Sequence, residues 1–421
     1  MTGRLTGLPL LAVAYAAARA SVVLGIAPVR FPDSTGYLAL DFLSPEARLW
    51  PVPLVYSLVR SDAARVGIHV LAGVVAWVLL AHVLSARSRF PGTARAVVLA
   101  VGLAPQVVRY DLTILSESLA ISAAVATVAL GVRAARRRSA DPLFIAVFTV
   151  FCMTRPQHLL LLFAAAAVVL VRTAVRRALP GLTATVILVA AALGGVMLHG
   201  NRPTSELNFY TVVVERVLND DSRFAWFVAH GMPEIPGMRQ AQSYDYPEQL
   251  PADVARYLRV PTGQAPPSLM RVGGMKFAEW VRADGWRTYA EFVITHPTDT
   301  RARLSGLADP TLDPPNDDFL PLLSRTVMAR WVFVPWQACA VIALAGIVMA
   351  IGAADRARMR ILLACTAATF VLYSSNALTS GIEHPRHMST VAVLVRLAAL
   401  VALSQMFTAR NATTEDQTAT V

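Results

Sequence analysis

The sequence predicts an all-α polytopic membrane protein with about ten transmembrane helices and one large extracytoplasmic loop. Three observations predict this class. Hydrophobic residues make up 55% of the 421-residue chain and charged residues only 15%, whereas a soluble domain carries roughly a quarter charged residues. Apolar runs that approach the ~20 residues needed to cross a bilayer recur along the chain. Arginines concentrate in the connections on one side of these runs, as the positive-inside rule requires.

Eight apolar runs are each interpreted as one span, and they lie at about 8–28, 66–84, 94–108, 113–132, 180–199, 332–352, 360–377 and 389–407. The region 142–171 is too long for one span and short for two, and Thr154, Arg155 and Pro156 interrupt it. Because proline disfavours the helical conformation of the residue before it, we expect two short helices, 142–154 and 157–171. The total is then ten spans.

The positions of the charged residues predict the orientation. With the N-terminus inside, the expected cytoplasmic segments carry fifteen basic and four acidic residues, an excess equal to the whole net charge of +11. The loop 201–330 carries 14 basic and 16 acidic residues and is nearly neutral. This asymmetry predicts a multi-pass plasma-membrane protein with both termini cytoplasmic. It also explains the basic charge without a nucleic-acid partner.

The predicted organisation has four parts. Residues 1–200 form an N-terminal transmembrane module of about seven helices, and its first outer loop, 29–64, is expected to contain an interfacial helix that begins at Ser44-Pro45-Glu46. Residues 201–330 form an extracytoplasmic loop or cap. Residues 331–407 form the C-terminal transmembrane helices, and the polar tail 408–421 is expected to be disordered.

Ionisable residues next to the predicted spans gather at the outer surface. An ionised side chain inside hydrocarbon costs a few kcal/mol on insertion scales, so such residues usually face a polar cavity or a partner. The candidate site residues are Asp33, Tyr37, Arg109, Asp111, Glu117, Arg155, Glu383, His384 and Arg386. Their common side predicts a site that opens outward.

Each candidate also has a structural interpretation. Asp33 could cap a turn, Glu117 could bond to the serines on either side of it, and Asp111 could pair with Arg109. Arg155 could cap carbonyl groups released by Pro156, and the residues 383–387 could be ordinary loop polarity. His384 and His387 have a spacing compatible with a metal, but no third ligand lies nearby in the sequence. No metal ligand is therefore assigned, although a divalent metal stays possible.

The chemistry that suits outward carboxylates surrounded by arginines is glycosyl transfer. A carboxylate can accept the proton of an acceptor hydroxyl as its oxygen attacks the anomeric carbon. Arginine or histidine side chains can stabilise the negative charge on a departing phosphate. Since nucleotide sugars are not supplied outside the cell, we expect a lipid-linked sugar donor. The sequence contains no Walker loop, dinucleotide fingerprint, zinc-protease helix or Gly-x-Ser-x-Gly elbow.

The same residues resemble the GT-C superfamily of membrane glycosyltransferases, which includes the polyprenyl-phosphate-sugar-dependent mannosyl- and arabinosyltransferases. The resemblance lies in Asp33-Ser34-Thr35-Gly36-Tyr37, Ser116-Glu117-Ser118, Thr154-Arg155-Pro156 and the late basic segment 383–387. It covers residues 1–200 and 330–407. It implies that Asp33 acts as base, that Glu117 or Asp111 is the second acid, and that Arg155 and Arg386 contact phosphate. The implied acceptor is a glycan, a lipid or a protein. The superfamily often has paired acids in the first loop, but here Ser34 follows Asp33.

Two other functions fit parts of the pattern. An envelope polysaccharide polymerase or ligase would share the helices, the large outer loop and the outward arginines without using a first-loop carboxylate. A transporter or flippase of a lipid-linked precursor would favour ionisable residues at the bilayer midplane and symmetric broken helices. In this sequence the acids lie near the outer rim, and only one break, at Arg155-Pro156, is evident.

Overall fold

The computed structural model describes residues 7–31, 33–38, 40, 48–137, 141–177, 181–200, 202–234, 238–239, 274–313, 320, 323, 325–353, 355–381 and 384–407. Every regular element in this part of the chain is helical. A single isolated parallel bridge joins Val29 to Thr113. The predicted all-α class is therefore confirmed for the described residues.

The first half of the chain contains the helices α1 Gly7–Val23, α2 Ser34–Leu38, α3 Pro51–Ser57, α4 Asp62–Ser85, α5 Pro91–Gly102, α6 Pro105–Val108, η2 Arg109–Leu112, α7 Glu117–Arg137, α8 Pro142–Cys152, η3 Pro156–His158, α9 Leu159–Arg176 and α10 Leu182–Gly200. The second half contains α11 Arg202–Arg216, α12 Asp221–Ala229, α14 Gly274–Trp280, η7 Val281–Gly285, α15 Trp286–Thr295, α16 Pro297–Leu312, η8 Arg330–Val332, α17 Trp336–Gly352, α18 Arg356–Thr379 and α19 His384–Met406.

Six described helical segments are long and apolar enough to cross a membrane: Asp62–Ser85, Glu117–Arg137, Pro156–Arg176, Arg330–Gly352, Arg358–Thr379 and His384–Met406. A bent pair, Pro91–Gly102 with Pro105–Leu112, is a candidate for a seventh span and turns by 51°. Three shorter apolar helices are Pro9–Val23, Pro142–Cys152 and Leu182–Leu198. These lengths and compositions indicate a multi-pass membrane protein.

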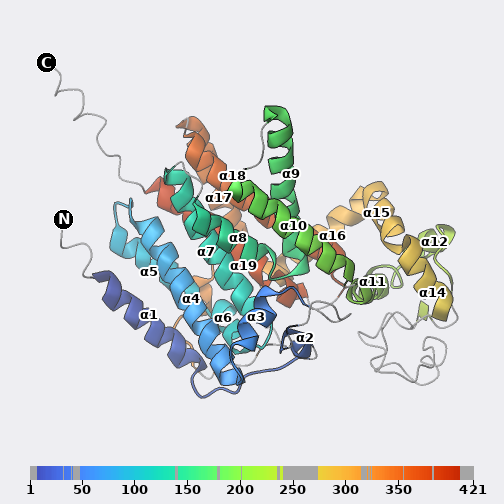
Figure 1. The fold of residues 1–421 in the computed structure, drawn as a ribbon, viewed down its shortest axis with the longest axis horizontal. Coiled ribbons are helices and arrows are strands. Elements are labelled where there is room, and N and C mark those ends of the chain that lie inside the picture. Colours follow the sequence, from blue (N-terminus) through green and yellow to red (C-terminus); the bar gives the residue numbers. More distant parts are fainter. Residues whose placement is uncertain are drawn as a thin grey trace.

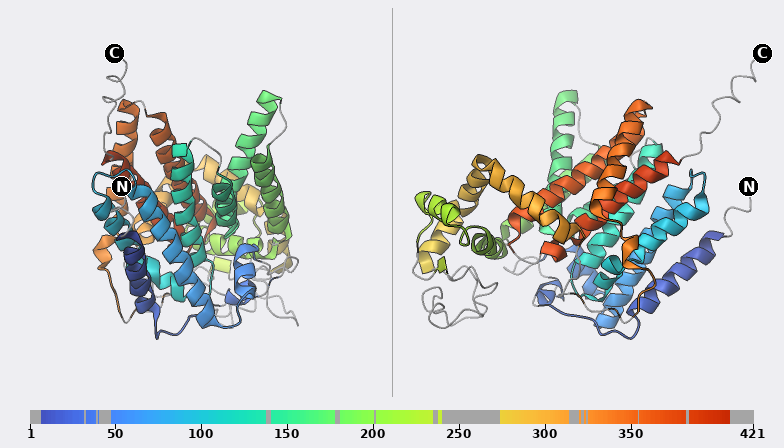
Figure 2. Two further views of the ribbon diagram at one scale, coloured as in Figure 1. Left: turned by 60° about the vertical axis from the view of Figure 1, so that its left-hand side comes forward. Right: turned by 180° about the vertical axis from the view of Figure 1, so that it is seen from behind.

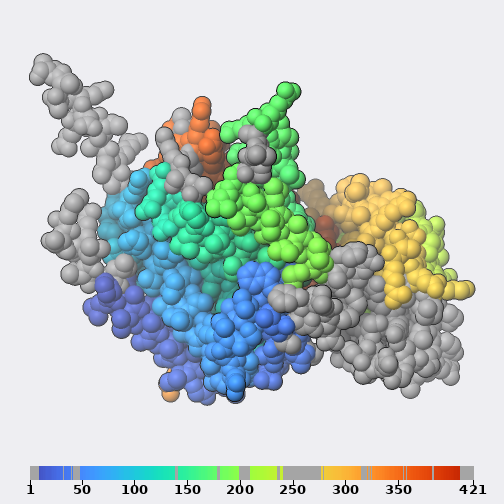
Figure 3. Space-filling model, in the orientation of Figure 1, coloured from blue at the N-terminus to red at the C-terminus, as the bar shows by residue number. Residues whose placement is uncertain are grey.

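The bundle is centred on α19. Most of its residues from Arg386 to Ala402 are buried, because α17 and α18 pack along it and α7 packs on its other side. α4 and α7 form the most extensive helix pair of the N-terminal half. Helices α11 to α15 extend sideways from the bundle and enclose an aromatic core of their own (Figures 1 and 2). Figure 3 shows this region projecting from one side of the main body.

The predicted break before Pro156 is present. Helix α8 ends at Cys152 and a 3-10 turn begins at Pro156, with Arg155 in an extended conformation between them. The other local prediction falls partly outside the described residues, since the expected helix start at Ser44-Pro45-Glu46 lies in the segment 41–47. The helices described within this loop are α2, Ser34–Leu38, and α3, which begins at Pro51.

Candidate functional site

The backbone bridge between Val29 and Thr113 brings two distant segments together. Two backbone hydrogen bonds, of 2.8 and 3.0 Å, connect Val29 to the residues on either side of Thr113. Asp33 follows Val29 by four residues, and Glu117 follows Thr113 by four. Both acids are consequently held at the same end of the bundle, the end that carries α2 and α3 (Figure 1).

Asp33 immediately precedes α2 and contacts two arginines. Its Oδ1 accepts a hydrogen bond of 3.1 Å from Nη2 of Arg48, and its Oδ2 accepts one of 2.8 Å from Nη2 of Arg386. Burial disfavours the ionised carboxyl, but the two guanidinium groups outweigh it and hold the pKa of Asp33 below its ordinary value. The side chain still keeps 41% of its surface exposed. Asp33 is therefore an ionised carboxylate that solvent or a ligand can reach.

Glu117 is the first residue of α7 and is almost fully buried. Its Oε1 lies 3.3 Å from Nε of Arg386 and 3.5 Å from Nη2 of Arg155. Its Oε2 is buried and has no hydrogen-bond partner among the described residues. Since buried polar atoms nearly always have a partner, this oxygen marks an incompletely satisfied site.

Arg386 connects the two acids. Its guanidinium group contacts Asp33 through Nη2 and Glu117 through Nε. Arg155 reaches the same place from the break between α8 and α9, and its Nη1 donates to the backbone oxygen of Arg386 at 3.4 Å. Nη2 of Arg155 lies 3.4 Å from Nδ1 of His387. We call Asp33, Arg48, Glu117, Arg155 and Arg386 the arginine–carboxylate site.

Tyr37 forms part of the wall of this site. Its hydroxyl donates to Oγ of Ser116 at 3.2 Å, so α2 is joined to the residue that precedes Glu117. The guanidinium carbon of Arg48 lies 5.3 Å from the centre of the Tyr37 ring, a distance at which a cation is attracted to an aromatic face. The structure thus places Tyr37, a predicted substrate contact, beside Arg48 and Ser116.

Asp111 and Arg109 lie elsewhere. The Asp111 carboxylate is fully buried and accepts hydrogen bonds from Nε and Nη2 of Arg19 at 2.9 and 3.0 Å and from Oγ of Ser118 at 2.7 Å. Arg109 donates to the backbone oxygen of Leu320 at 2.9 Å. The structure thus groups Asp111 with Arg19, a partner that the sequence analysis missed, and not with the arginine–carboxylate site.

His384 belongs to a neighbouring ionic cluster. Its Nε2 lies 2.8 Å from Nη2 of Arg303 on α16 and 3.4 Å from Oε1 of Glu215 on α11. Burial opposes the ionisation of Glu215, but His384 and Arg303 outweigh it and lower the pKa of Glu215. This cluster attaches α11 and α16 to the first turn of α19, two residues before Arg386. Glu383 lies outside the described residues.

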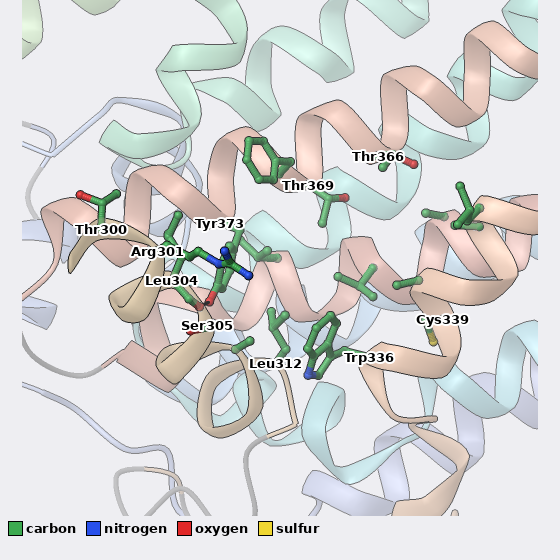
Figure 4. A pocket seen from close by; sticks show the side chains of 18 of the residues that line it. Thr300, Arg301, Leu304, Ser305, Leu312, Trp336, Cys339, Thr366, Thr369 and Tyr373 are labelled. Atoms are coloured by element: carbon green, nitrogen blue, oxygen red, sulfur yellow. Dashed lines mark hydrogen bonds between the residues drawn. The ribbon is translucent and has the colours of Figure 1, made fainter. Parts of the chain in front are cut away.

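A cavity of about 680 Å³ lies between α16, α17, α18 and α19 (Figure 4). Its lining is mostly aliphatic and aromatic, and Figure 4 shows Thr300, Arg301 and Ser305 together at one end. Val391 and Val395 line it from α19. Because residues four apart share a helix face, His387, Val391 and Val395 form one stripe on α19, which begins at the residue after Arg386 and continues into the cavity lining.

Within the described ranges, no group of three or more histidine, cysteine, aspartate or glutamate side chains is placed to hold a metal ion. No protein-family model, curated protein or solved structure matches the chain. The interpretation of the site therefore rests on its own geometry.

Proposed function

We propose that the protein is an inverting glycosyltransferase that moves a sugar from a polyprenyl-phosphate donor to an extracytoplasmic acceptor in the cell envelope. The observation that supports this most directly is the charge balance of the arginine–carboxylate site. Three guanidinium groups, from Arg48, Arg155 and Arg386, surround the two carboxylates of Asp33 and Glu117. The surplus cation and the bidentate geometry that guanidinium groups favour are suited to a phosphate oxyanion.

The membrane topology is also part of this proposal. The six long apolar segments, the bent pair and the three shorter apolar helices correspond to the ten predicted runs, and we assign each run to one span. The termini would be cytoplasmic, and the end that carries α2, α3 and the arginine–carboxylate site would be extracytoplasmic. Residues 201–330 would form the cap that receives the acceptor.

Exposure assigns different roles to the two acids. Asp33 keeps 41% of its side-chain surface exposed and is the general base, which accepts the proton of the acceptor hydroxyl while that oxygen bonds to the anomeric carbon. The bond between the anomeric carbon and the phosphate oxygen breaks, and the electron pair leaves with the phosphate. Glu117 has 2% of its side chain exposed and orients Arg155 and Arg386 toward that phosphate.

The low pKa of Asp33 is compatible with this role. Arg48 and Arg386 hold the carboxylate ionised but also make it a weak base. A donor phosphate competes for the same guanidinium groups. When it draws Arg386 away, the Asp33 carboxylate loses a cationic partner and its basicity rises. Donor binding would thereby activate the base.

The chain of the donor requires an apolar surface close to the phosphate. The cavity between α16 and α19 (Figure 4) offers about 680 Å³ with a largely hydrocarbon lining, and the stripe from His387 to Val395 leads to it. We assign this cavity to the isoprenoid chain. Replacing Ala343, which lines it, with tryptophan should raise the KM for long-chain donors more than for short-chain donors.

The decisive test is Asp33→Asn in proteoliposomes with a radiolabelled polyprenyl-phosphate sugar. Loss of a general base typically lowers the rate by about 10²- to 10⁴-fold, and we expect a loss in this range with normal membrane insertion. Asp62→Asn is the matched control, because Asp62 is also ion-paired with two arginines, Arg30 and Arg65, but lies outside the arginine–carboxylate site. Full activity of Asp33→Asn would contradict the assignment.

The same assay separates the alternative functions. Activity that survives Asp33→Asn but disappears in Arg386→Gln would favour a polysaccharide polymerase or ligase, which needs the phosphate contact but no first-loop base. Movement of a lipid-linked precursor across the vesicle membrane without any new glycosidic bond would favour a transporter or flippase.

A further inference from the structure

A continuous apolar groove runs between α5 and α19. Two cavities, of about 240 and 430 Å³, share Val97 on α5 and Leu400 and Leu403 on α19 as lining residues. They are therefore parts of one groove. Its two long walls are residues spaced three or four apart, which are Phe90 and, on α5, Thr93, Ala94, Val97, Ala100 and Val101, and, on α19, Arg396, Ala399, Leu400, Leu403 and Ser404, followed by Phe407. The segment 328–334 and Cys339 and Ile342 of α17 also line the larger cavity.

The groove exists because α5 and α19 pack on other helices more than on each other. α19 packs closely on α17 and α18, and α5 packs on α4, but α5 and α19 are not packed against each other in the same way. One hydrogen bond joins the residues next to α5 and α19 at one end of the groove, and another joins α6 to η8 near the other end. The Arg89 backbone NH donates to the oxygen of Phe407 at 3.0 Å, and the Gln106 side chain donates to the oxygen of Arg330 at 3.3 Å. The hydrocarbon surface between these ends is left for another occupant.

Arginines from three helical regions gather at the end of the groove near Phe407. Arg87 and Arg89 are exposed and flank Ser88, which lines the groove. Arg136 at the end of α7 interacts electrostatically with both Arg87 and Arg358. Arg358 donates to the backbone oxygen of Gln405 at 3.3 Å.

The charge at this end is incompletely neutralised. Arg358 pairs with Asp355, and this is the one ion pair that these four arginines make within the described part of the chain. Like charges held this close repel one another, and a bound anion relieves the repulsion. The groove thus ends in a place suited to a negatively charged group.

We infer that the groove binds an anionic glycerophospholipid, with one acyl chain between α5 and α19 and its phosphate among Arg87, Arg89, Arg136 and Arg358. From Phe90 to Val101 the α5 helix rises about 16 Å, at 1.5 Å per residue, which matches half of a hydrocarbon core of ~30 Å. One acyl chain of the adjacent leaflet therefore fills the groove. Basic pockets between transmembrane helices are known to recognise anionic headgroups.

This lipid differs from the proposed donor in position. The arginine–carboxylate site lies at the first turn of α19, whereas the arginines of the groove surround its last turn. The inference therefore does not depend on glycosyl transfer, and either proposal can fail without the other.

The test uses the full chain, purified in detergent and delipidated, with dioleoyl phosphatidylglycerol and dioleoyl phosphatidylcholine as probes. Native mass spectrometry counts the bound lipids, and thermal unfolding reports their effect. We expect one phosphatidylglycerol molecule to be retained preferentially and to raise the Tm by several degrees, and phosphatidylcholine to have little effect. Equal retention of the two lipids would overturn the inference.

Two variants separate a specific site from general attraction to basic residues. Arg87→Gln/Arg89→Gln should weaken phosphatidylglycerol binding about tenfold. The control Arg172→Gln/Arg176→Gln removes the same charge from exposed arginines at the end of α9 and should leave binding unchanged. Equal losses in the two double variants would show that net charge alone attracts the lipid.

A third variant tests the groove itself. Val97→Trp places a large side chain at the α5 residue that lines both cavities and should abolish the preferential retention while all arginines are kept. If this variant does not fold, Ser404→Leu fills the same groove by a smaller volume and should weaken retention. Undiminished binding in a folded Val97→Trp protein would exclude the chain position that we assign.

Discussion

Asp111 and Glu117 are buried carboxylates only six residues apart on the chain, and each forms a group with arginine side chains. The two groups differ in how completely the carboxylate is hydrogen-bonded. In the first, Asp111 receives two hydrogen bonds from Arg19 and one from Ser118, and Arg19 also donates to the Tyr15 hydroxyl and the Gly102 oxygen. In the second, Glu117 faces two arginines at 3.3 and 3.5 Å, and one of its oxygens has no hydrogen-bond partner among the described residues.

This difference distinguishes a structural ion pair from a functional one. A buried ion pair offsets the cost of desolvation only when its geometry is good and its remaining donors and acceptors are bonded. The Arg19–Asp111 pair meets this condition and connects α1 to the segment before α7. The arginine–carboxylate site does not meet it, and Asp33 there remains partly exposed. Such a site is poised to exchange its internal contacts for those of a ligand.

The largest expected effect is on stability and comes from Asp111→Asn. Removing this charge leaves Arg19, which is 1% exposed, as a buried cation without its counterion. Loss of one partner from a buried pair costs about 3–5 kcal/mol, so we expect a strongly lowered Tm and poor recovery of folded protein. Thermal unfolding in detergent measures this.

The double variant Arg19→Met/Asp111→Leu is the control for that prediction. It removes both charges and replaces them with apolar side chains of similar size, a change that is often neutral for stability. We expect most of the Tm to return. A double variant as unstable as Asp111→Asn would mean that the pair contributes more than charge compensation.

The second prediction is that Glu117→Gln lowers transfer activity much more than it lowers stability. The amide keeps the shape of the side chain but no longer attracts Arg155 and Arg386, so the phosphate contacts are misplaced. We expect transfer to fall by about 10²-fold, in the range found when one stabilising group for developing charge is lost, while the Tm falls much less than in Asp111→Asn, because Arg386 keeps its contact with Asp33. A Tm loss as large as that of Asp111→Asn would make Glu117 structural as well.

Much of this contrast could be predicted from the sequence. Asp33, Glu117, Arg155 and Arg386 stood out because charges beside long apolar runs are costly, and the structure brings all four together. The break at Arg155 could be predicted from Pro156, because proline acts locally on the residue before it.

Other parts depended on information that a single sequence does not hold. Arg19 lies inside an otherwise apolar run, and its pairing with Asp111 spans 92 residues, so no local spacing reveals it. Arg48 is one of several arginines in the first connection, and only tertiary structure selects it as the partner of Asp33. The Glu215–Arg303–His384 cluster joins three helices and was missed for the same reason.

The third prediction tests whether the Tyr37 hydroxyl takes part in the reaction or only positions α2 beside the arginine–carboxylate site. Tyr37→Phe removes the hydrogen bond to Ser116 but keeps the ring beside Arg48. A hydrogen bond contributes about 0.5–1.5 kcal/mol, so we expect transfer to fall by less than about tenfold, with the larger change in KM because α2 carries Asp33 into the site. Steady-state kinetics with the polyprenyl-phosphate donor measures both constants, and Tyr210→Phe, in the aromatic core of the cap, is the matched control. A loss as large as that of Asp33→Asn would place the Tyr37 hydroxyl in the chemistry itself.

The smallest expected effect is the dependence of stability on pH. Because Arg48 and Arg386 lower the pKa of Asp33, its ion pairs stabilise the folded protein above the ordinary carboxyl pKa of about 3.9. This contribution is lost as the pH falls through the lower pKa of the folded state. Solvent screening keeps it small, since 41% of the side chain is exposed.

Asp33→Asn should therefore have a slightly lower Tm than the wild type at pH 6, and the difference should begin to shrink below about pH 4 and be lost as the pH falls through the lower pKa of the folded state. Thermal unfolding of both proteins from pH 6 to pH 3 tests this. Asp111→Asn supplies the contrast at pH 6, because it leaves a fully buried arginine without its counterion and should lower the Tm much more. If the Tm loss of Asp33→Asn at pH 6 were as large, the two groups would not differ in kind, and the distinction between a structural pair and a ligand site would fail at its most exposed residue.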